Sequence, residues 1–421
     1  MVHSMSEISR MVEKAKTASA AMALLPTSVK NRALKAMADG LDRGGKDILA
    51  ANGRDLAAAR AKGIAGALLD RLMLNEKRIG EMPRGLREVA RLPDPVGQVI
   101  SRRTRPNGLR ILKVRVPIGV IAIVYEARPN VTADCAGLCI KSGNSVILRG
   151  GSEAIHSNRA IFRRIEAAGR KAGLAEGALQ LVWDTDRRSV DELLGTPGGV
   201  DLVIPRGGEG LIRQVVAKAK VPVIKQYKGI CHTYVDASAD LKKAEEICFN
   251  AKVQRPGVCN AMETLLVHRA AAPKFLPAMA RRYAQAGVRL RGDAPTRRIL
   301  RGMPVQPATE RDWATEYLDL ILSVKVVGSV GEAMEHIRRW GSSHSDAIVT
   351  RSKPNAARFL KGVDSACVYV NASTRFTDGG QFGLGAEIGV STDKLHARGP
   401  MGLEELTTYK YEVTGTGQVR R

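Results

Sequence analysis

Short apolar runs in the first half of the chain constrain its fold more than any other feature. VPIGVIAIVY at 116–125, SVILRG at 145–150 and DLVIP at 201–205 have the length of strands, and helix-like segments separate them. A further strand is predicted for VPVIKQY at 221–227. Strands that alternate with helices are typical of a parallel sheet. The pattern therefore predicts a Rossmann-like α/β domain.

The same alternation restarts later in the chain. Strand-length apolar runs lie at 263–268, 321–327 and 346–350, and helical patterns lie at 273–286 and 330–340. We expect these segments to form a second α/β domain.

Two other regions flank the predicted strands. Residues 7–92 have Ala and Leu three and four positions apart, which predicts helices. Pro106-Asn107-Gly108 is a hairpin turn signal between two Arg-rich strands. The tail EELTTYKYEVTG at 404–415 is strand-like, and we expect it to pair with the hairpin at 100–115. A long charged hairpin of this kind usually serves assembly or a partner.

The charge of the chain raises one alternative class of function. The formal net charge is +24, and residues 101–115 hold six basic residues and no acidic ones. Nucleic-acid binding is the alternative that such an excess suggests. However, the basic residues are spread along the chain, aromatics make up only 4%, and no zinc-finger spacing or RNA-binding aromatic motif is present. We expect a surface suited to anionic ligands, and nucleic-acid binding is the weaker interpretation.

Several patterns bear on location and metals. The N-terminal segment lacks the apolar core of a signal peptide, and the longest apolar run, 116–125, is too short to span a bilayer. The six cysteines form no disulfide framework. These patterns predict a cytoplasmic protein without a membrane segment. Cys135 and Cys139 share a helix face, but no second ligand pair accompanies them, so no metal site is predicted.

Cys259, in QRPGVCNAMETLLVH at 254–268, has the most suggestive surroundings of any cysteine. A lone cysteine is usually a small buried apolar residue. Here Gly257 precedes it, an apolar strand follows, and the position is a junction between predicted domains, where clefts form. As a thiolate it would be an effective nucleophile. A protease-like arrangement needs a histidine, and His232 and His268 are the nearest in sequence.

Three long stretches resemble the gamma-glutamyl phosphate reductases, a family in the aldehyde dehydrogenase superfamily. They are VCNAMETLLVH, YEARPNVTADCAGLCIKSGNSVILRGGSEA and FTDGGQFGLGAEIGVSTDKLHARGPMGLEELTTYKY, in family order over essentially the whole chain. The resemblance implies an aldehyde dehydrogenase-like fold. It also implies NADPH-dependent reduction of L-glutamyl 5-phosphate to L-glutamate 5-semialdehyde with release of phosphate, a step of proline biosynthesis.

The resemblance assigns catalytic roles to two residues. Cys259 falls where the superfamily nucleophile lies, and Asn130, in EARPN, matches the asparagine that stabilises the oxyanion together with the nucleophile's own N–H. In QYKGICHTYVD at 226–236, Tyr227 or Lys228 stands where hydrolytic aldehyde dehydrogenases have a general-base glutamate. The thioester should then survive to meet hydride or phosphate. A hydrolytic aldehyde dehydrogenase is the alternative enzyme.

The resemblance also points to ligand-binding residues. For the cofactor it implies a clamp on the 2′-phosphate by Arg149 and Ser152, phosphate binding by a Gly-rich turn, and a ribose contact by Glu316; the turn contains Gly207, Gly208 and Gly210. For the substrate we expect contacts from Ser345, Asp346 and Arg375, with arginine suited to the carboxylate and aspartate to the ammonium. By itself, each of these residues is equally compatible with an ordinary turn or surface role.

These expectations give a three-part organisation. The predicted parts are an NADPH-binding domain, a catalytic domain, and a small β assembly region, at 1–99 with 116–255, at 256–403, and at 100–115 with 404–421. The superfamily likeness implies a homodimer or homotetramer. A glutamate 5-kinase, which makes the unstable acyl phosphate, is a further candidate partner.

Overall fold

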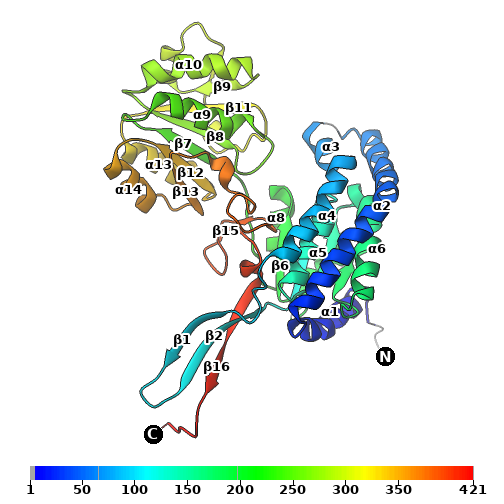
Figure 1. The fold of residues 1–421 in the computed structure, drawn as a ribbon. Helices are drawn as coiled ribbons and strands as arrows, with labels where there is room; N and C mark the ends of the chain where they lie inside the picture. The colour runs from blue at the N-terminus through cyan, green and yellow to red at the C-terminus, as the bar shows by residue number, and fades with distance from the viewer. Residues whose placement is uncertain (1–4, 65, 197, 421) are drawn as a thin grey trace. The chain divides into compact units, whose positions relative to one another are not determined.

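The computed structural model describes residues 5–64, 66–196 and 198–420, and the chain divides into two compact units (Figure 1). The first unit comprises 1–225, 383–389 and 401–421, and the second comprises 226–382 and 390–400. Each unit contains its own parallel sheet. Residues 1–4 of the predicted first domain and residue 421 of the predicted tail lie outside the described residues.

Over its described residues, 7–64 and 66–92, the predicted helical segment forms four helices, which confirms the expectation. They are α1 (Glu7–Ala23), α2 (Thr27–Ala61), α3 (Gly66–Leu72) and α4 (Glu76–Arg91). The long helix α2 packs against α4 and against α6 (Ile155–Lys171). Neither α2 nor any other helix of the described ranges has the combination of length and apolar character that a membrane crossing requires.

The sheet of the first unit has the strand order β5-β4-β3-β6, with all neighbours parallel. The strands are β3 (Val120–Tyr125), β4 (Ser145–Gly150), β5 (Leu179–Leu181) and β6 (Leu202–Arg206). Further helical elements of this unit are α5 (Val131–Lys141), η1 (Ser152–Ala154), α7 (Arg187–Gly195), α8 (Glu209–Lys218) and η3 (Glu404–Leu406). Every residue of β3 and β4 is buried, as expected for apolar strands covered on both faces. The Rossmann-like α/β prediction is confirmed.

A separate three-stranded sheet extends from the first unit. Its order is β1-β2-β16, from β1 (Val99–Thr104), β2 (Arg110–Pro117) and β16 (Thr407–Thr414), and all pairs are antiparallel. The predicted pairing of the tail with the hairpin is therefore confirmed. Tyr409, Tyr411 and Val413 on β16 are exposed.

The second unit is built on a seven-stranded parallel sheet with the order β10-β9-β11-β8-β7-β12-β13. Its strands are β7 (Cys231–Val235), β8 (Met262–His268), β9 (Arg289–Gly292), β10 (Val305–Pro307), β11 (Ile321–Val327), β12 (Ser345–Val349) and β13 (Cys367–Val370). Its helices are α9 (Leu241–Val253), α10 (Ala272–Gln285), α11 (Ala294–Ile299), α12 (Glu310–Trp313), α13 (Val330–Trp340), α14 (Lys353–Gly362) and η2 (Thr374–Phe376). The predicted second α/β domain is confirmed.

The boundary between the units lies earlier than the predicted 255/256. The second unit begins at Gln226, because β7 pairs with both β8 and β12 and so belongs to their sheet. The strand predicted at 221–227 is wrong: only an isolated bridge joins Val223 to Val203. Pro222 has no N–H to donate, so this stretch cannot continue a regular ladder.

Candidate active site

Cys259 lies in a turn of the second unit, between the end of α9 and the start of β8. All six cysteines lie in the described ranges; five are buried, and Cys259 alone is partly exposed. Burial raises the pKa of the Cys135 thiol to about 12, and it also raises those of Cys139 and Cys248. A buried thiol of this kind is inert, so Cys259 is the cysteine suited to reaction.

The backbone of Cys259 packs directly against Gly229, which precedes β7. A Cβ atom on residue 229 would lie 2.0 Å from the Cys259 carbonyl oxygen and 2.5 Å from its Cα. Only glycine fits such an approach. The Cys231 thiol donates to the same carbonyl at 3.2 Å. Tyr227 and Lys228, the residues aligned with the missing general base, immediately precede this contact.

His344 is the histidine beside Cys259, although it was not among the residues expected from the sequence. It is fully buried and lies within electrostatic reach of Cys259. The Cys231 thiol contacts both residues, at 3.7 Å from His344 Nδ1 and 3.2 Å from the Cys259 carbonyl oxygen. His232 instead bonds Asp346 through Nδ1 at 2.8 Å, and His268 ends β8, away from the Cys259 turn. Neither His232 nor His268, the two histidines nearest to Cys259 in sequence, is therefore the histidine partner of Cys259.

Ser345 and Asp346 begin β12 and are both fully buried. The Ser345 hydroxyl lies 2.8 Å from His344 Nδ1 and 2.6 Å from Thr377 Oγ1. One oxygen of Asp346 accepts from the N–H and from Nδ1 of His232, and the other accepts from the Ser365 hydroxyl. The assignment of Ser345 and Asp346 as substrate-binding residues stays a prediction. The contacts of Asp346 with His232 and Ser365 are those of a structural residue.

Arg375, in η2, is half-buried and lies within electrostatic reach of Cys259. Its Nε donates to Gln254 Oε1 at 2.8 Å. Burial and the neighbouring Arg255 lower the pKa of Arg375, while the charge of Cys259 acts in the opposite direction. A guanidinium in this position suits the predicted contact with a substrate carboxylate, which stays a prediction.

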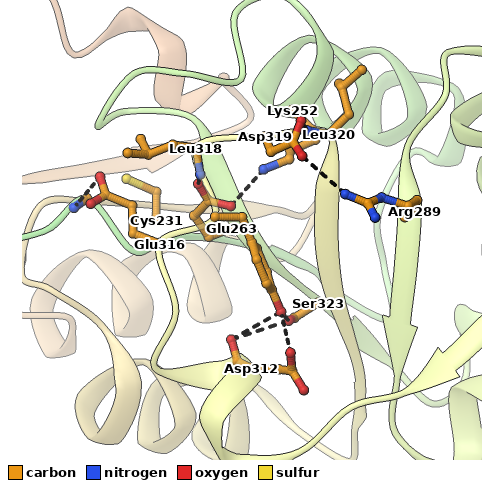
Figure 2. Close-up of polar contacts among 12 residues, drawn as sticks. Cys231, Lys252, Glu263, Arg289, Asp312, Glu316, Leu318, Asp319, Leu320 and Ser323 are labelled. Carbon is orange, nitrogen blue, oxygen red and sulfur yellow. Dashed lines mark hydrogen bonds and ion pairs between the residues drawn. The ribbon is translucent and has the colours of Figure 1, made fainter. Parts of the chain in front are cut away.

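Glu316 lies on the loop before β11, and its carboxylate accepts from the Gly229 N–H at 2.9 Å. Two residues later the backbone of Leu318 adopts φ +53°, a left-handed conformation that is uncommon for leucine. The Leu318 N–H is held by Glu263 Oε1 at 3.2 Å (Figure 2). The loop that carries Glu316 is therefore fixed at several points near the Cys259 turn.

A buried ion pair lies behind that loop. Lys252 on α9 and Glu263 on β8 are 2.7 Å apart, and both side chains are fully buried (Figure 2). Burial raises the pKa of Glu263 to about 7, and the charge of Lys252 and its hydrogen bond oppose the rise. Glu263 thus connects the interior of the sheet to the Glu316 loop.

In the first unit, Arg149 and Ser152 lie where β4 ends. Arg149 is buried, and its guanidinium donates to the carbonyls of Gly150 at 3.2 Å and Thr185 at 3.0 Å. Its Nε is buried without a hydrogen-bond partner among the described residues. Ser152 is exposed at the start of η1. This arginine is held in place and retains one unsatisfied donor.

The predicted Gly-rich turn follows β6 and opens α8. The N–H of Gly208, which directly precedes α8, donates to the carboxylate of Glu126 at 3.0 Å. A Cβ at Gly207 would lie 2.5 Å from the same carboxylate, whereas one at Gly210 would meet no atom within 4 Å. The loops after β3 and β6 meet at the point where strand order reverses, which is where such sheets bind ligands.

Asn130 immediately precedes α5 and follows the loop after β3. Its amide donates to Asp134 Oδ2 at 2.8 Å. Burial raises the pKa of Asp134 to about 6, and the bond from Asn130 opposes that rise. One N–H of the amide is used in this bond, and an asparagine amide carries two.

Across the described residues, no group of three or more His, Cys, Asp or Glu side chains has the arrangement of a metal site.

Comparisons with known proteins identify the family. A family model described as "Aldehyde dehydrogenase family" matches residues 2–296. The chain is 59% identical over 415 residues to a gamma-glutamyl phosphate reductase from Moorella thermoacetica, covering 99% of each chain. It is 56% identical over 415 residues to one from Caldanaerobacter subterraneus, covering 99% of this chain and 100% of the relative.

Solved structures agree with these relatives. The crystal structure of a gamma-glutamyl phosphate reductase from Thermotoga maritima matches with a TM-score of 0.95 and 50% identity, over 99% of this chain and 100% of that one. An acetylating aldehyde dehydrogenase from Geobacillus thermoglucosidasius matches with a TM-score of 0.70 and 16% identity, over 99% and 98%. The second match concerns the fold alone. The chain belongs to the gamma-glutamyl phosphate reductases, within the aldehyde dehydrogenase family.

Proposed function

We propose that the chain reduces L-glutamyl 5-phosphate to L-glutamate 5-semialdehyde and releases phosphate, as a step in proline biosynthesis. The observation that carries the proposal is Cys259, a partly exposed cysteine beside a buried histidine in a chain whose full-length relatives bear the reductase name. The same relatives do not favour a nucleic-acid-binding function for the +24 charge.

Cys259 supplies the covalent step of this reaction. Its sulfur bonds to the acyl carbon, the bond from that carbon to the phosphate oxygen breaks, and a thioester results. After reduction the carbonyl re-forms, and Cys259 leaves as the thiolate. The Cys259 N–H and the Asn130 amide stay the predicted donors to the oxyanion, whose stabilisation is a large part of such catalysis.

A nicotinamide cofactor supplies the hydride when it is bound, and the first unit has the features that fit one. The unsatisfied Nε of Arg149 and the exposed Ser152 suit a phosphate group. The switch-point loops after β3 and β6 suit a dinucleotide. We propose NADPH rather than NADH, with Arg149 and Ser152 at the 2′-phosphate, the Gly-rich turn at the pyrophosphate and Glu316 at the nicotinamide ribose.

The remaining ligands and partners follow from the same proposal. We propose that Arg375, which lies within electrostatic reach of Cys259, holds the carboxylate of the small-molecule substrate. The exposed apolar and aromatic side chains on β16 suit assembly into a homodimer or homotetramer through the three-stranded sheet. We further propose a cytoplasmic location, and glutamate 5-kinase as a candidate partner that hands over the unstable acyl phosphate.

The reverse reaction tests the proposed function. Purified protein is mixed with glutamate semialdehyde and NADP+, and NADPH absorbance is followed with and without inorganic phosphate. We expect phosphate-dependent NADPH formation that falls by at least about 10³-fold in Cys259→Ala, because the nucleophile is gone. The matched control is Cys248→Ala, which removes a fully buried thiol on α9.

Two outcomes contradict the proposal. NADPH formation that needs no phosphate indicates a hydrolytic aldehyde dehydrogenase. Equal activity in Cys259→Ala and Cys248→Ala means that the nucleophile is misassigned.

A further inference from the structure

The reaction needs Cys259 as a thiolate, and a thiolate at neutral pH needs positive charge nearby. In many proteins the N-terminus of a helix supplies part of that charge. No helix begins at Cys259: α9 ends at Val253, and β8 begins at Met262. The end of a helix carries partial negative charge, so α9 gives no help. The charge must come from a side chain.

His344 occupies the place where such a side chain is needed. It is fully buried, and the Cys231 thiol lies against both its Nδ1 and the Cys259 carbonyl, which places the imidazole beside the nucleophile. Its Nδ1 lies 2.8 Å from Ser345 Oγ and 3.7 Å from Cys231 Sγ. Its Nε2 is buried and has no hydrogen-bond partner in the described part of the chain. A base for the thiol requires a buried imidazole in which one nitrogen is held by a hydrogen bond and the other is available to accept the proton.

We propose that His344 is a catalytic residue that accepts the proton of the Cys259 thiol and pairs, as imidazolium, with the thiolate. The S–H bond breaks, an N–H bond forms on the imidazole, and no electrons are gained or lost. The pair serves twice: it activates the nucleophile and it stabilises the thiolate when the aldehyde departs. The acyl chemistry rests on the proposed function, but the proton transfer itself needs no substrate.

A chain of hydroxyl groups fixes the imidazole. Ser345 Oγ contacts His344 Nδ1, and Thr377 Oγ1 lies 2.6 Å from Ser345 Oγ and 2.7 Å from Tyr369 Oη. The carbonyl of Thr377 also accepts a hydrogen bond, at 2.9 Å, from the side-chain amide of Asn260, the residue that follows Cys259. With Ser345 accepting from Nδ1–H, the lone pair of the neutral ring lies on Nε2. Ser345 is therefore a positioning residue.

The electrostatic surroundings favour the imidazolium. The titratable groups that face the imidazole or the thiol are Cys231 on β7, Cys259, Glu316 before β11, Asp346 on β12 and Arg375 in η2, and Tyr369 on β13 lies near Cys231. Burial opposes protonation of His344, but the charge and hydrogen bond of Cys259, followed by Glu316 and Asp346, raise its pKa above the ordinary value. The imidazole and the thiol titrate together as one pair.

The rate at which iodoacetamide alkylates Cys259, measured as a function of pH without substrate, tests the proposal. Peptide mass spectrometry identifies the labelled cysteine. In His344→Gln we expect the midpoint of the alkylation profile to move up by about one pH unit or more, because the opposite charge is lost. The matched control is His336→Gln, which removes another buried imidazole, on α13, and should leave the midpoint in place.

The outcomes separate this inference from the proposed function. A folded His344→Gln protein with the wild-type midpoint overturns the inference, whatever the enzyme assay gives. If the proposed reaction holds, the same variant should also lose about 10²-fold in turnover. If His344→Gln does not fold, a second measurement tests the inference. The thiolate absorbance of Cys259, obtained as the wild-type absorbance minus that of Cys259→Ala, is then measured as a function of pH. A thiolate that persists at neutral pH supports the pair, and one that forms only above about pH 8.5 overturns it.

Discussion

The two units place their candidate residues at opposite edges of their parallel sheets. In the first unit, Asn130 and Gly208 follow strands and Arg149 is the second-last residue of β4, so all three lie at the carboxyl edge. In the second unit, Cys259 and His344 precede strands, at the amino edge. At a carboxyl edge helices begin, and their free N–H groups favour anions. At an amino edge helices end, so charge has to be supplied by side chains.

The carboxyl edge of the second sheet is filled by its own side chains. Asp236, which follows β7, accepts from the hydroxyls of Thr350 and Ser238 and from the Asn355 amide. Those hydrogen bonds hold the pKa of Asp236 below its usual range, although burial alone would raise it. The comparison teaches that two parallel sheets in one chain use different edges. The first unit offers its carboxyl edge to ligands, and the second unit holds its reactive residues at the amino edge, among buried polar contacts.

The largest expected effect comes from breaking the buried pair of the second unit. Lys252→Met leaves the Glu263 carboxylate buried without its cation, which should lower the free energy of unfolding by about 3–5 kcal/mol. Adding Glu263→Gln should recover most of the loss, because the amide oxygen still accepts from Leu318. Chemical denaturation of the two variants checks this, and a double variant no more stable than Lys252→Met contradicts it.

The same variant has a pH dependence with a defined sign. The folded pKa of Glu263, about 7, lies above the ordinary 4.5, so its protonated form is favoured by the fold. Stability from this group is complete below pH about 4.5 and is lost as pH rises through about 7. Without Lys252 the loss should deepen, so the destabilisation in Lys252→Met should be greater at pH 8 than at pH 5.

An intermediate effect is expected at the edge of the first unit. Arg149→Ala removes the unsatisfied donor and its charge, so the Michaelis constant for NADPH should rise by about 10- to 100-fold. The constant for NADH should change much less, because NADH lacks the 2′-phosphate. Steady-state kinetics with both cofactors check this. Equal losses for the two cofactors would show that Arg149 only holds the loop at Thr185.

The smallest effect distinguishes two glycines at the start of α8. Gly210→Ala enters open space within a helix, so it should stabilise the protein by about 0.5–1 kcal/mol. Gly207→Ala meets the Glu126 carboxylate and should give no such gain. Thermal unfolding of both variants checks the contrast, and equal gains would mean that Glu126 moves aside freely.

Much of the fold could be predicted from sequence because the buried strands are short, apolar runs. The pairing of the tail with the hairpin was also predictable, since both segments have strand character and a turn signal joins the hairpin. The boundary at 226 was not, because membership of β7 in the second sheet depends on its neighbours, β8 and β12. Local pattern carries no information about such neighbours.

The candidate site divides in the same way. Cys259 was found from its local surroundings and the family motif. His344 was missed because SSHSD resembles a turn, and its approach to Cys259 requires β12 to lie beside β7. Gly229 was missed for a related reason: its contact is with a backbone distant in sequence. The signal was the glycine in QYKGICH, directly before an apolar strand.

The pairing of β16 with β2 also sets an order for folding during synthesis. All eight residues of β16 pair with a strand made roughly three hundred residues earlier, so this contact closes a very long loop. Such contacts form late, because closing the loop costs chain entropy before the contacts contribute any stabilisation. The second unit, made between these strands, can complete its sheet while β2 still has an open edge. During synthesis that open edge can pair wrongly with other chains.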